Sequence, residues 1–389
     1  MSQPDQELLA ATDALRKGNA RAARDGFARV LAAGRGDVSS LLGMAAACRA
    51  LGDHDGVISA TQSLLAKEPR NLHALIFTGD AYSARGDSRT ATSFYLAALK
   101  SAPPAAQLPQ ELIRELRRVR DACDQASAHY RDYILDQMQK RGFDPATSSP
   151  RFAQSLDIVL GRKRIYVQEP FYYYFAGLPQ IQFYDNAAFD WVAGIEAQTD
   201  AIQAELLGVL DVPGAFAPYV TGASNRPVNG QAGMLNNPDW SAFYLWKNGE
   251  RVEENAARFP QTMRALENIP LAFVPGRSPS VLFSLLRPGT HIPPHHGMVN
   301  TRLICHLPII VPGPCRFRVG NETRHWTRGK CWLFDDTIEH EAWNDTDQAR
   351  VILLFDVWKP ELSQEERELV ISLFEAIDAH DGKRPDWSI

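Results

Sequence analysis

The sequence predicts an α+β protein of several domains, with an all-α repeat solenoid followed by an antiparallel β-barrel. The first observation behind this prediction is a 34-residue spacing of the turns Gly18-Asn19, Gly52-Asp53 and Gly86-Asp87. The second is a series of short apolar runs between Thr301 and Phe355, separated by Gly, Pro, Asn and Asp. The third is length, because 389 residues exceed the usual size of one domain.

The 34-residue period predicts helix-turn-helix units of the tetratricopeptide kind in residues 1–103. Further positions keep the same register, namely Phe27, Thr61 and Tyr95, and Leu31, Leu65 and Leu99. Each helix pair of such an array has an apolar face that a neighbouring pair must bury. The array either binds a protein or peptide on its concave face or supports the domain that follows, and both interpretations stay open.

A capping helix and a linker are expected in residues 104–150. Apolar residues recur at three- and four-residue spacing from Pro109 to about Gly142, which predicts a long amphipathic helix. The Pro- and Ser-rich segment 144–150 then predicts a linker. We therefore place a domain boundary here and assign residues 151–362 to the barrel domain.

Residues 363–389 are expected to form a C-terminal helix and tail. Ser363 followed by Glu366 is the capping-box pattern of a helix start, and the helix is predicted to end near Ala379. Its predicted packing stripe consists of Leu369, Val370, Leu373, Phe374 and Ile377. We expect this helix to have a structural role.

The barrel is predicted from short runs rich in Val, Ile, Phe and Trp. These runs are Trp240–Trp246, Leu303–Val311, Cys315–Val319, Lys330–Phe334 and Val351–Trp358. Strands of this length, separated by turn residues, are typical of a jelly roll or a cupin-like barrel. Helical spacing in Trp191–Leu210 predicts a helix ahead of these strands.

Two histidines stand at predicted strand ends. His295 ends a Pro-rich turn, and His340 follows the polar turn 334–339 just before a strand. Strand ends of one barrel converge on its mouth, so we expect the two imidazoles to meet there. Neutral imidazole is a common ligand of iron, zinc, copper and nickel. The sequence therefore predicts a metal site in the barrel.

Two segments resemble the catalytic domain of the aspartyl/asparaginyl β-hydroxylase family. They read SLLRPGTHIPPHHGMVNTR from Ser284 to Arg302 and FDDTIEHEAWNDTDQARVILLFDVWKPEL from Phe334 to Leu362. The resemblance covers roughly Leu178–Leu362. It implies a double-stranded β-helix and Fe(II)- and 2-oxoglutarate-dependent dioxygenase chemistry, with O2 as the other co-substrate.

The resemblance also implies roles for particular residues. His295 and His340 match the two iron-binding histidines of the family. Arg350 matches the arginine that pairs with the distal carboxylate of 2-oxoglutarate. Ser284 and His306 match further contacts to this co-substrate, although a histidine inside a strand is also compatible with a purely structural place in the core.

Three other positions qualify this match. Arg302 is expected to bind a carboxylate of the substrate or the co-substrate. Ile304 stands where better-known members have another arginine, which argues against a preference for acidic side chains. Gly297 stands where a conventional facial triad has Asp or Glu, but the family also has glycine there.

The remaining histidines of this region have open roles. His296 is adjacent to His295, and two neighbours in an extended segment cannot both face one metal ion. The match with the family favours His295. His291 and His296 are then either groups that surround the site or exposed side chains.

Composition excludes several classes of protein. The formal net charge is −5 and no Lys- or Arg-rich block stands alone, so a nucleic-acid partner is not expected. No apolar run approaches the roughly 18 residues of a membrane helix, and the start of the sequence lacks the pattern of a signal peptide. We therefore expect a cytoplasmic protein. The five cysteines show no CxxC spacing, which favours reduced thiols over a disulfide framework or a zinc site.

The leading functional interpretation is a hydroxylase that acts on an Asp, Asn or other residue of a protein or peptide recruited through the repeats. The reaction would convert 2-oxoglutarate into succinate and carbon dioxide. A second interpretation keeps this chemistry but takes a free amino acid, a small metabolite or a lipid acyl chain as substrate. A third is a non-catalytic repeat scaffold with a degenerate barrel, against which the intact His295, His340 and Arg350 argue.

Overall fold

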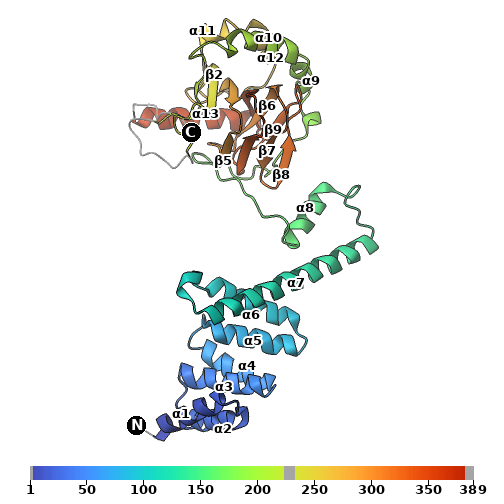
Figure 1. Cartoon of the computed structure of the whole chain (residues 1–389). Helices are drawn as coiled ribbons and strands as arrows, with labels where there is room; N and C mark the ends of the chain where they lie inside the picture. The colour runs from blue at the N-terminus through green and yellow to red at the C-terminus, as the bar shows by residue number, and fades with distance from the viewer. Residues whose placement is uncertain (1–2, 223–232, 382–389) are drawn as a thin grey trace. The chain divides into compact units, whose positions relative to one another are not determined.

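The chain forms two compact units, Met1–Arg162 and Lys163–Ile389 (Figure 1). A computed structural model describes residues 3–222 and 233–381. In this described part, none of the helices combines the length and the apolar character needed to cross a bilayer. All five cysteines are buried free thiols, as the sequence predicts.

The first unit consists of helices, and each of the first seven packs on its neighbour along the chain. They are α1 (Gln3–Arg16), α2 (Ala20–Ala32), α3 (Val38–Ala50), α4 (His54–Leu65), α5 (Leu72–Ala84), α6 (Ser88–Ser101), α7 (Gln110–Lys140) and α8 (Pro150–Val159). The predicted tetratricopeptide-like array is confirmed as the pairs α1/α2, α3/α4 and α5/α6. The long helix α7 packs its first half on α6 through Leu112, Val119 and Cys123.

The 34-residue signal has a local physical cause in the turn within each pair. Gly18, Gly52 and Gly86 have positive φ angles of 79°, 71° and 80°, which side chains with a Cβ rarely adopt. The following Asn19, Asp53 and Asp87 cap α2, α4 and α6, because each side chain accepts a hydrogen bond from a backbone N–H of the first turn. Glycine reverses the chain and the next residue starts the second helix.

The second unit is built from antiparallel strands. They are β1 (Ala217–Pro218), β2 (Trp240–Lys247), β3 (Glu250–Arg251), β4 (Val281–Leu286), β5 (His291–His295), β6 (Arg302–Ile310), β7 (Cys315–Val319), β8 (Glu322–His325), β9 (Trp332–Phe334), β10 (His340–Asn344) and β11 (Arg350–Trp358). A larger sheet has the order β1-β2-β4-β11-β6-β9, with β3 beside β2. A smaller sheet has the order β5-β10-β7-β8. The predicted jelly roll is thus confirmed.

The larger sheet has a different neighbour on each face. One face packs against α9 (Val192–Glu196), α10 (Thr199–Leu210) and α12 (Pro260–Leu266) in the main apolar core. The other face shares a second apolar cluster with the smaller sheet. The space between the two sheets is therefore the interior of the jelly roll.

Two expectations about helices need correction. The predicted helix Trp191–Leu210 is two helices, because the chain turns at Ala197–Gln198 and the Thr199 hydroxyl donates to the Glu196 carbonyl. The C-terminal helix α13 (Gln364–Asp381) starts with the predicted capping box. Its predicted stripe is only partly buried. Val370 and Phe374 pack inside, whereas Leu369, Leu373 and Ile377 are 61%, 40% and 38% exposed.

Close packing in the repeat array makes a prediction for Gly43 in α3. A Cβ at this position would overlap the ring of Phe27, which is buried. We expect Gly43→Ala to destabilise the first unit by about 1–3 kcal/mol, although alanine is the better helix former. The measurement is thermal unfolding followed by circular dichroism at 222 nm.

The matched control is Gly208→Ala in α10, where nothing lies within 4 Å of the added Cβ. This change should leave stability unchanged or raise it by up to about 1 kcal/mol. All eight tryptophans come after residue 190, so their fluorescence reports the second unit separately. A Gly43→Ala protein as stable as the wild type would contradict the packing argument.

Candidate active site

The interior of the jelly roll contains a cavity of about 270 Å³ between the two sheets. Alternation along the strands decides which side chains reach it, because successive residues point to opposite faces. On β6 as far as His306 and on β11 as far as Asp356, the even-numbered residues line the cavity, and the odd-numbered ones enter the helix-covered core. These cavity-lining residues are Arg302, Ile304, His306, Arg350, Ile352, Leu354 and Asp356.

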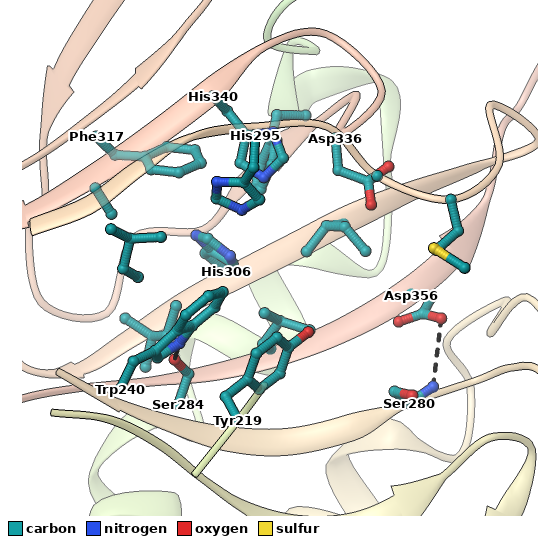
Figure 2. A pocket seen from close by; sticks show the side chains of 18 of the residues that line it. Tyr219, Trp240, Ser280, Ser284, His295, His306, Phe317, Asp336, His340 and Asp356 are labelled. Atoms are coloured by element: carbon teal, nitrogen blue, oxygen red, sulfur yellow. Dashed lines mark hydrogen bonds between the residues drawn. The ribbon is translucent and has the colours of Figure 1, made fainter. Parts of the chain in front are cut away.

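His295 and His340 meet on the side of the cavity formed by the smaller sheet (Figure 2). They are directly opposite each other on β5 and β10, and their ring centroids are 4.0 Å apart. The Nδ1 atom of His295 lies 2.8 Å from the Pro293 carbonyl, and that of His340 lies 3.1 Å from the Ile338 carbonyl. A carbonyl only accepts, so each Nδ1 carries the proton and each Nε2 keeps its lone pair.

The two histidines are also electrically suited to bind a cation. Burial lowers the pKa of His295 to about 4 and holds the pKa of His340 well below its usual value. Both rings are therefore neutral at pH 7, which is the form that ligates metals. Within residues 3–222 and 233–381, no cluster of three or more His, Cys, Asp or Glu side chains could hold a metal ion. The imidazole pair of His295 and His340 stays the candidate metal-binding donor set.

Arg350 is a buried cation without a counter-charge among the described residues. It is 1% exposed, and its Nε and Nη1 atoms have no hydrogen-bond partner in the described residues. Its guanidinium lies over the ring of Trp326, 4.6 Å from the centroid. Burial lowers its pKa to about 10, so it still carries its charge at pH 7. Leaving such a charge unpaired is unfavourable, so this end of the cavity suits an anion.

Ser284 and His306 line the same cavity as Arg350 and the histidine pair. Ser284 accepts a hydrogen bond of 3.1 Å from Trp240 Nε1, and Trp240 stacks on Tyr219 with centroids 4.3 Å apart. The Nδ1 atom of His306 is buried without a partner in the described chain. This unpartnered atom favours a ligand contact over a satisfied core histidine.

Asp336 is a site residue that the sequence analysis missed. Its carboxylate fills the space beside Gly297, so that a Cβ at position 297 would overlap it. Burial raises the pKa of Asp336 to about 7, against the opposing effect of Arg302. Its Oδ1 atom is buried and has no partner in the described residues. The sequence feature that could have identified Asp336 is its place in the turn that leads into His340.

Arg302 lines the cavity but is already paired. Its Nη1 atom donates to the Asp356 carboxylate, and its Nη2 atom lies 3.6 Å from Asp336 Oδ2. The sequence analysis predicted that Arg302 binds a carboxylate of the substrate or the co-substrate, and it did not anticipate either acidic partner. The role of Arg302 in substrate binding stays a prediction.

His291 and His296 lie outside the pair. His291 is largely exposed, contacts Glu341 at 2.9 Å and stacks on Trp343 with centroids 4.8 Å apart. His296 lines the cavity, and its ring lies edge-on to Phe171 with centroids 6.4 Å apart. Neither ring stands opposite His340 in the strand pairing, which places His295 in that position.

The turn that precedes His340 is fixed by a buried ion pair. Lys359 Nζ donates to Asp335 Oδ2 over 2.6 Å, and both side chains are fully buried. Gln168 donates to the same carboxylate atom over 2.6 Å, and Thr337 donates to the other oxygen. These bonds hold the segment that carries Asp336 and His340 against the large sheet.

The fold and the cavity define a jelly-roll protein whose interior holds a histidine pair and a buried arginine that has no counter-charge in the part of the chain that the structure describes. Residues 196–360 match the sequence profile of the aspartyl/asparaginyl β-hydroxylase family. Over that segment the chain is similar to this hydroxylase family, in agreement with the resemblance found in the sequence.

Two named hydroxylases are similar to the chain, which spans less than two thirds of the length of each. The chain is 38% identical over 184 residues to the ornithine lipid ester-linked acyl 2-hydroxylase of Rhizobium tropici. The aligned segment covers 46% of this chain and 60% of the relative. It is 36% identical over 178 residues to the human aspartyl/asparaginyl β-hydroxylase, covering 45% of this chain and 22% of that protein. Among solved structures it is similar to the Sgt2 TPR domain of Aspergillus fumigatus, with 17% identity, a TM-score of 0.29, and coverage of 33% of this chain and 83% of that one.

The buried pair of Lys359 and Asp335 makes a stability prediction. Lys359→Met should destabilise the second unit by about 3–5 kcal/mol, because it leaves a buried carboxylate without its counter-charge. The control is Lys330→Met, since the exposed Lys330 pairs with Glu196 at the surface and should contribute less than about 1 kcal/mol. Urea unfolding followed by tryptophan fluorescence measures both. Equal effects of the two changes would contradict the assigned role of the buried pair.

Proposed function

We propose that the second unit is an Fe(II)- and 2-oxoglutarate-dependent dioxygenase that hydroxylates a residue of a protein or peptide. The observation that carries this proposal is the guanidinium of Arg350, which is buried without a counter-charge among the described residues and shares one cavity with two neutral, inward-facing imidazoles. A ligand with one carboxylate for the arginine and metal-chelating atoms at its other end satisfies both features. The keto acid 2-oxoglutarate has this form.

Some residues of the cavity would hold the metal, and others would orient the co-substrate. His295 and His340 would bind iron through Nε2, because their Nδ1 protons are held by backbone carbonyls. Arg350 would bind the distal carboxylate with charge-assisted hydrogen bonds, and its planar fork suits this geometry. Ser284 and His306 line the cavity and would contact the same molecule. The bound iron would supply the activation of O2 for substrate oxidation.

The apolar lining of the cavity also limits the access of water to the site of the proposed reaction. The strand residues Ile304, Ile352 and Leu354 line the cavity together with Trp240 and Phe317. Apolar walls strengthen the attraction between Arg350 and an anion, since the local dielectric is low. They also protect reactive species from side reactions with solvent.

A protein or peptide substrate is the first candidate because helical repeat arrays offer a surface for polypeptides. A lipid acyl chain is the second candidate, favoured by the relative from Rhizobium tropici whose name states acyl 2-hydroxylation. The apolar lining of the cavity is compatible with either.

The first test is an anaerobic titration of the purified full chain with Fe(II) and 2-oxoglutarate. The wild type should show the weak visible charge-transfer band of the chelated complex. Arg350→Ala should raise the 2-oxoglutarate concentration needed for half-maximal signal at least tenfold, because a buried charge pair is lost. His340→Ala should abolish the band and the aerobic release of succinate.

The control for the arginine is Arg328→Ala, which removes an exposed guanidinium bound to Asp200 and Gln203 at the surface. It should leave the titration unchanged. Succinate release that persists in His340→Ala would rule out the assigned ligand. If the wild type binds the metal but shows no charge-transfer band, the proposed oxygenase function is contradicted.

The role of the repeats has its own test. Removing the unit Met1–Arg162 should leave uncoupled turnover of 2-oxoglutarate intact but lower kcat/KM for a protein substrate at least tenfold, through loss of a recruitment surface. Substrates are first identified by mass spectrometry of a proteome treated with the full chain. Equal activity of both proteins on such a substrate would assign the repeats a structural role.

A further inference from the structure

Trp240 is a buried aromatic residue in the wall of the cavity. It lies on β2 and is 7% exposed. Its indole N–H donates to the Ser284 hydroxyl oxygen over 3.1 Å, and Figure 2 shows the two side chains next to each other. An indole nitrogen can donate but cannot accept, so Ser284 is the acceptor in this bond. The direction of the hydrogen bond is therefore fixed by the chemistry of the two groups.

The hydroxyl proton of Ser284 is left for a ligand. A serine hydroxyl has one proton to donate and two lone pairs that accept. One lone pair is used by Trp240, and none of the described residues accepts the proton. Ser284 is 3% exposed and lines the cavity. Because a buried donor without an acceptor is unfavourable, this place favours a ligand group that accepts a hydrogen bond.

Strand register brings Ser284 and Arg350 together on one face of the larger sheet. Ser284 on β4 is directly opposite Ile352 on β11, and Arg350 is two positions before Ile352. Residues two positions apart on a strand point to the same face, and diagonal neighbours on paired strands are about 7–8 Å apart. Both side chains line the cavity. A carboxylate has acceptor sites enough to bind the hydroxyl and the guanidinium together.

Packing holds the indole of Trp240 in one orientation. The ring stacks on Tyr219 with centroids 4.3 Å apart, and the backbone N–H of Tyr219 donates to the Trp240 carbonyl over 2.9 Å. On the neighbouring strand Trp240 stands directly opposite Leu286, two positions from Ser284. Its ring centroid is also 5.8 Å from that of His295. A side chain locked by such contacts keeps its N–H directed at the hydroxyl.

We propose that Trp240 is a positioning residue that makes Ser284 a hydrogen-bond donor to the distal carboxylate of the co-substrate. The indole N–H occupies a lone pair of the hydroxyl and so turns the Ser284 proton toward the carboxylate that Arg350 binds. Without the indole the hydroxyl rotates freely, and its orientation has to be fixed when the co-substrate binds. This inference rests on the proposed function and adds to it a residue that acts through Ser284.

The test measures the 2-oxoglutarate concentration that gives the half-maximal charge-transfer signal, with full-length proteins loaded anaerobically with Fe(II). Trp240→Phe keeps an aromatic ring and removes the N–H. It should raise this concentration about fivefold, and Ser284→Ala should raise it about tenfold, since a hydrogen bond to a charged group is weakened or lost. In the Ser284→Ala protein, adding Trp240→Phe should change it less than about twofold, because the two residues act as one unit.

Two controls separate positioning from general damage. Trp246→Phe removes, from the same strand, an indole N–H that has no partner in the described chain, and this ring packs on the helix-covered core. It should leave the titration unchanged. The second control is 2-oxopentanoate, which has a methyl group in place of the distal carboxylate. Its half-maximal concentration should be the same for the wild type and Trp240→Phe.

A second variant covers the case in which Trp240→Phe does not fold, as judged by circular dichroism. Replacing Trp240 by 3-benzothienylalanine keeps the two-ring shape and removes only the N–H. The same rise for 2-oxoglutarate and the same constancy for 2-oxopentanoate are expected. The Fe(II) concentration needed for half-maximal loading should also stay unchanged, since His295 is not altered.

Each outcome decides the inference. Additive effects of Trp240→Phe and Ser284→Ala would overturn it, and so would no effect of Trp240→Phe or equal weakening of both keto acids. A higher Fe(II) requirement in Trp240→Phe would mean that the ring acts through His295, which also overturns it. A wild type without a band contradicts the proposed function itself, whereas a normal band with additive effects contradicts this inference alone.

Discussion

The second unit depends on the register of β6 and β11 at the centre of its larger sheet. Because side chains alternate, Leu303, Cys305 and Leu307 enter the core under the helices while Arg302, Ile304 and His306 enter the cavity. A slip of one residue would exchange these two sets and bury charges in the helix-covered core. The same apolar residues that stabilise the sheet therefore also fix where its polar residues act.

Buried cations in this unit differ in how their charge is compensated. Lys359 has a fully buried carboxylate partner, and Arg302 has two carboxylates beside it. Arg350 has none in the described chain and instead lies over an indole ring. Since stability alone favours compensation, the uncompensated charge marks the place where an external anion completes the structure. The contrast between these three side chains is a stronger argument for a binding site than the burial of any one of them.

The sequence predicts local features well and contacts between distant segments poorly. The bounds of β7 agree with its apolar run, and β11 begins one residue earlier than expected, because turn residues frame both. The pairing of Arg302 with Asp356 was not foreseen, since it depends on which strands are neighbours. Periodicity in α13 was correct, yet a period does not reveal how wide the buried face is, and Leu369 is exposed.

The contact between Gly297 and Asp336 joins two segments of the candidate site that are far apart in the sequence. In a conventional triad the carboxylate would follow the first histidine on its own strand. Here that position has no side chain, and the Asp336 carboxylate fills the space from the turn before β10. The backbone of Gly297 donates to the Asp336 carbonyl over 2.6 Å, so the two segments are held together. Because one turn carries both Asp336 and His340, the pair of Lys359 and Asp335 that anchors this turn positions an acid and a histidine at once.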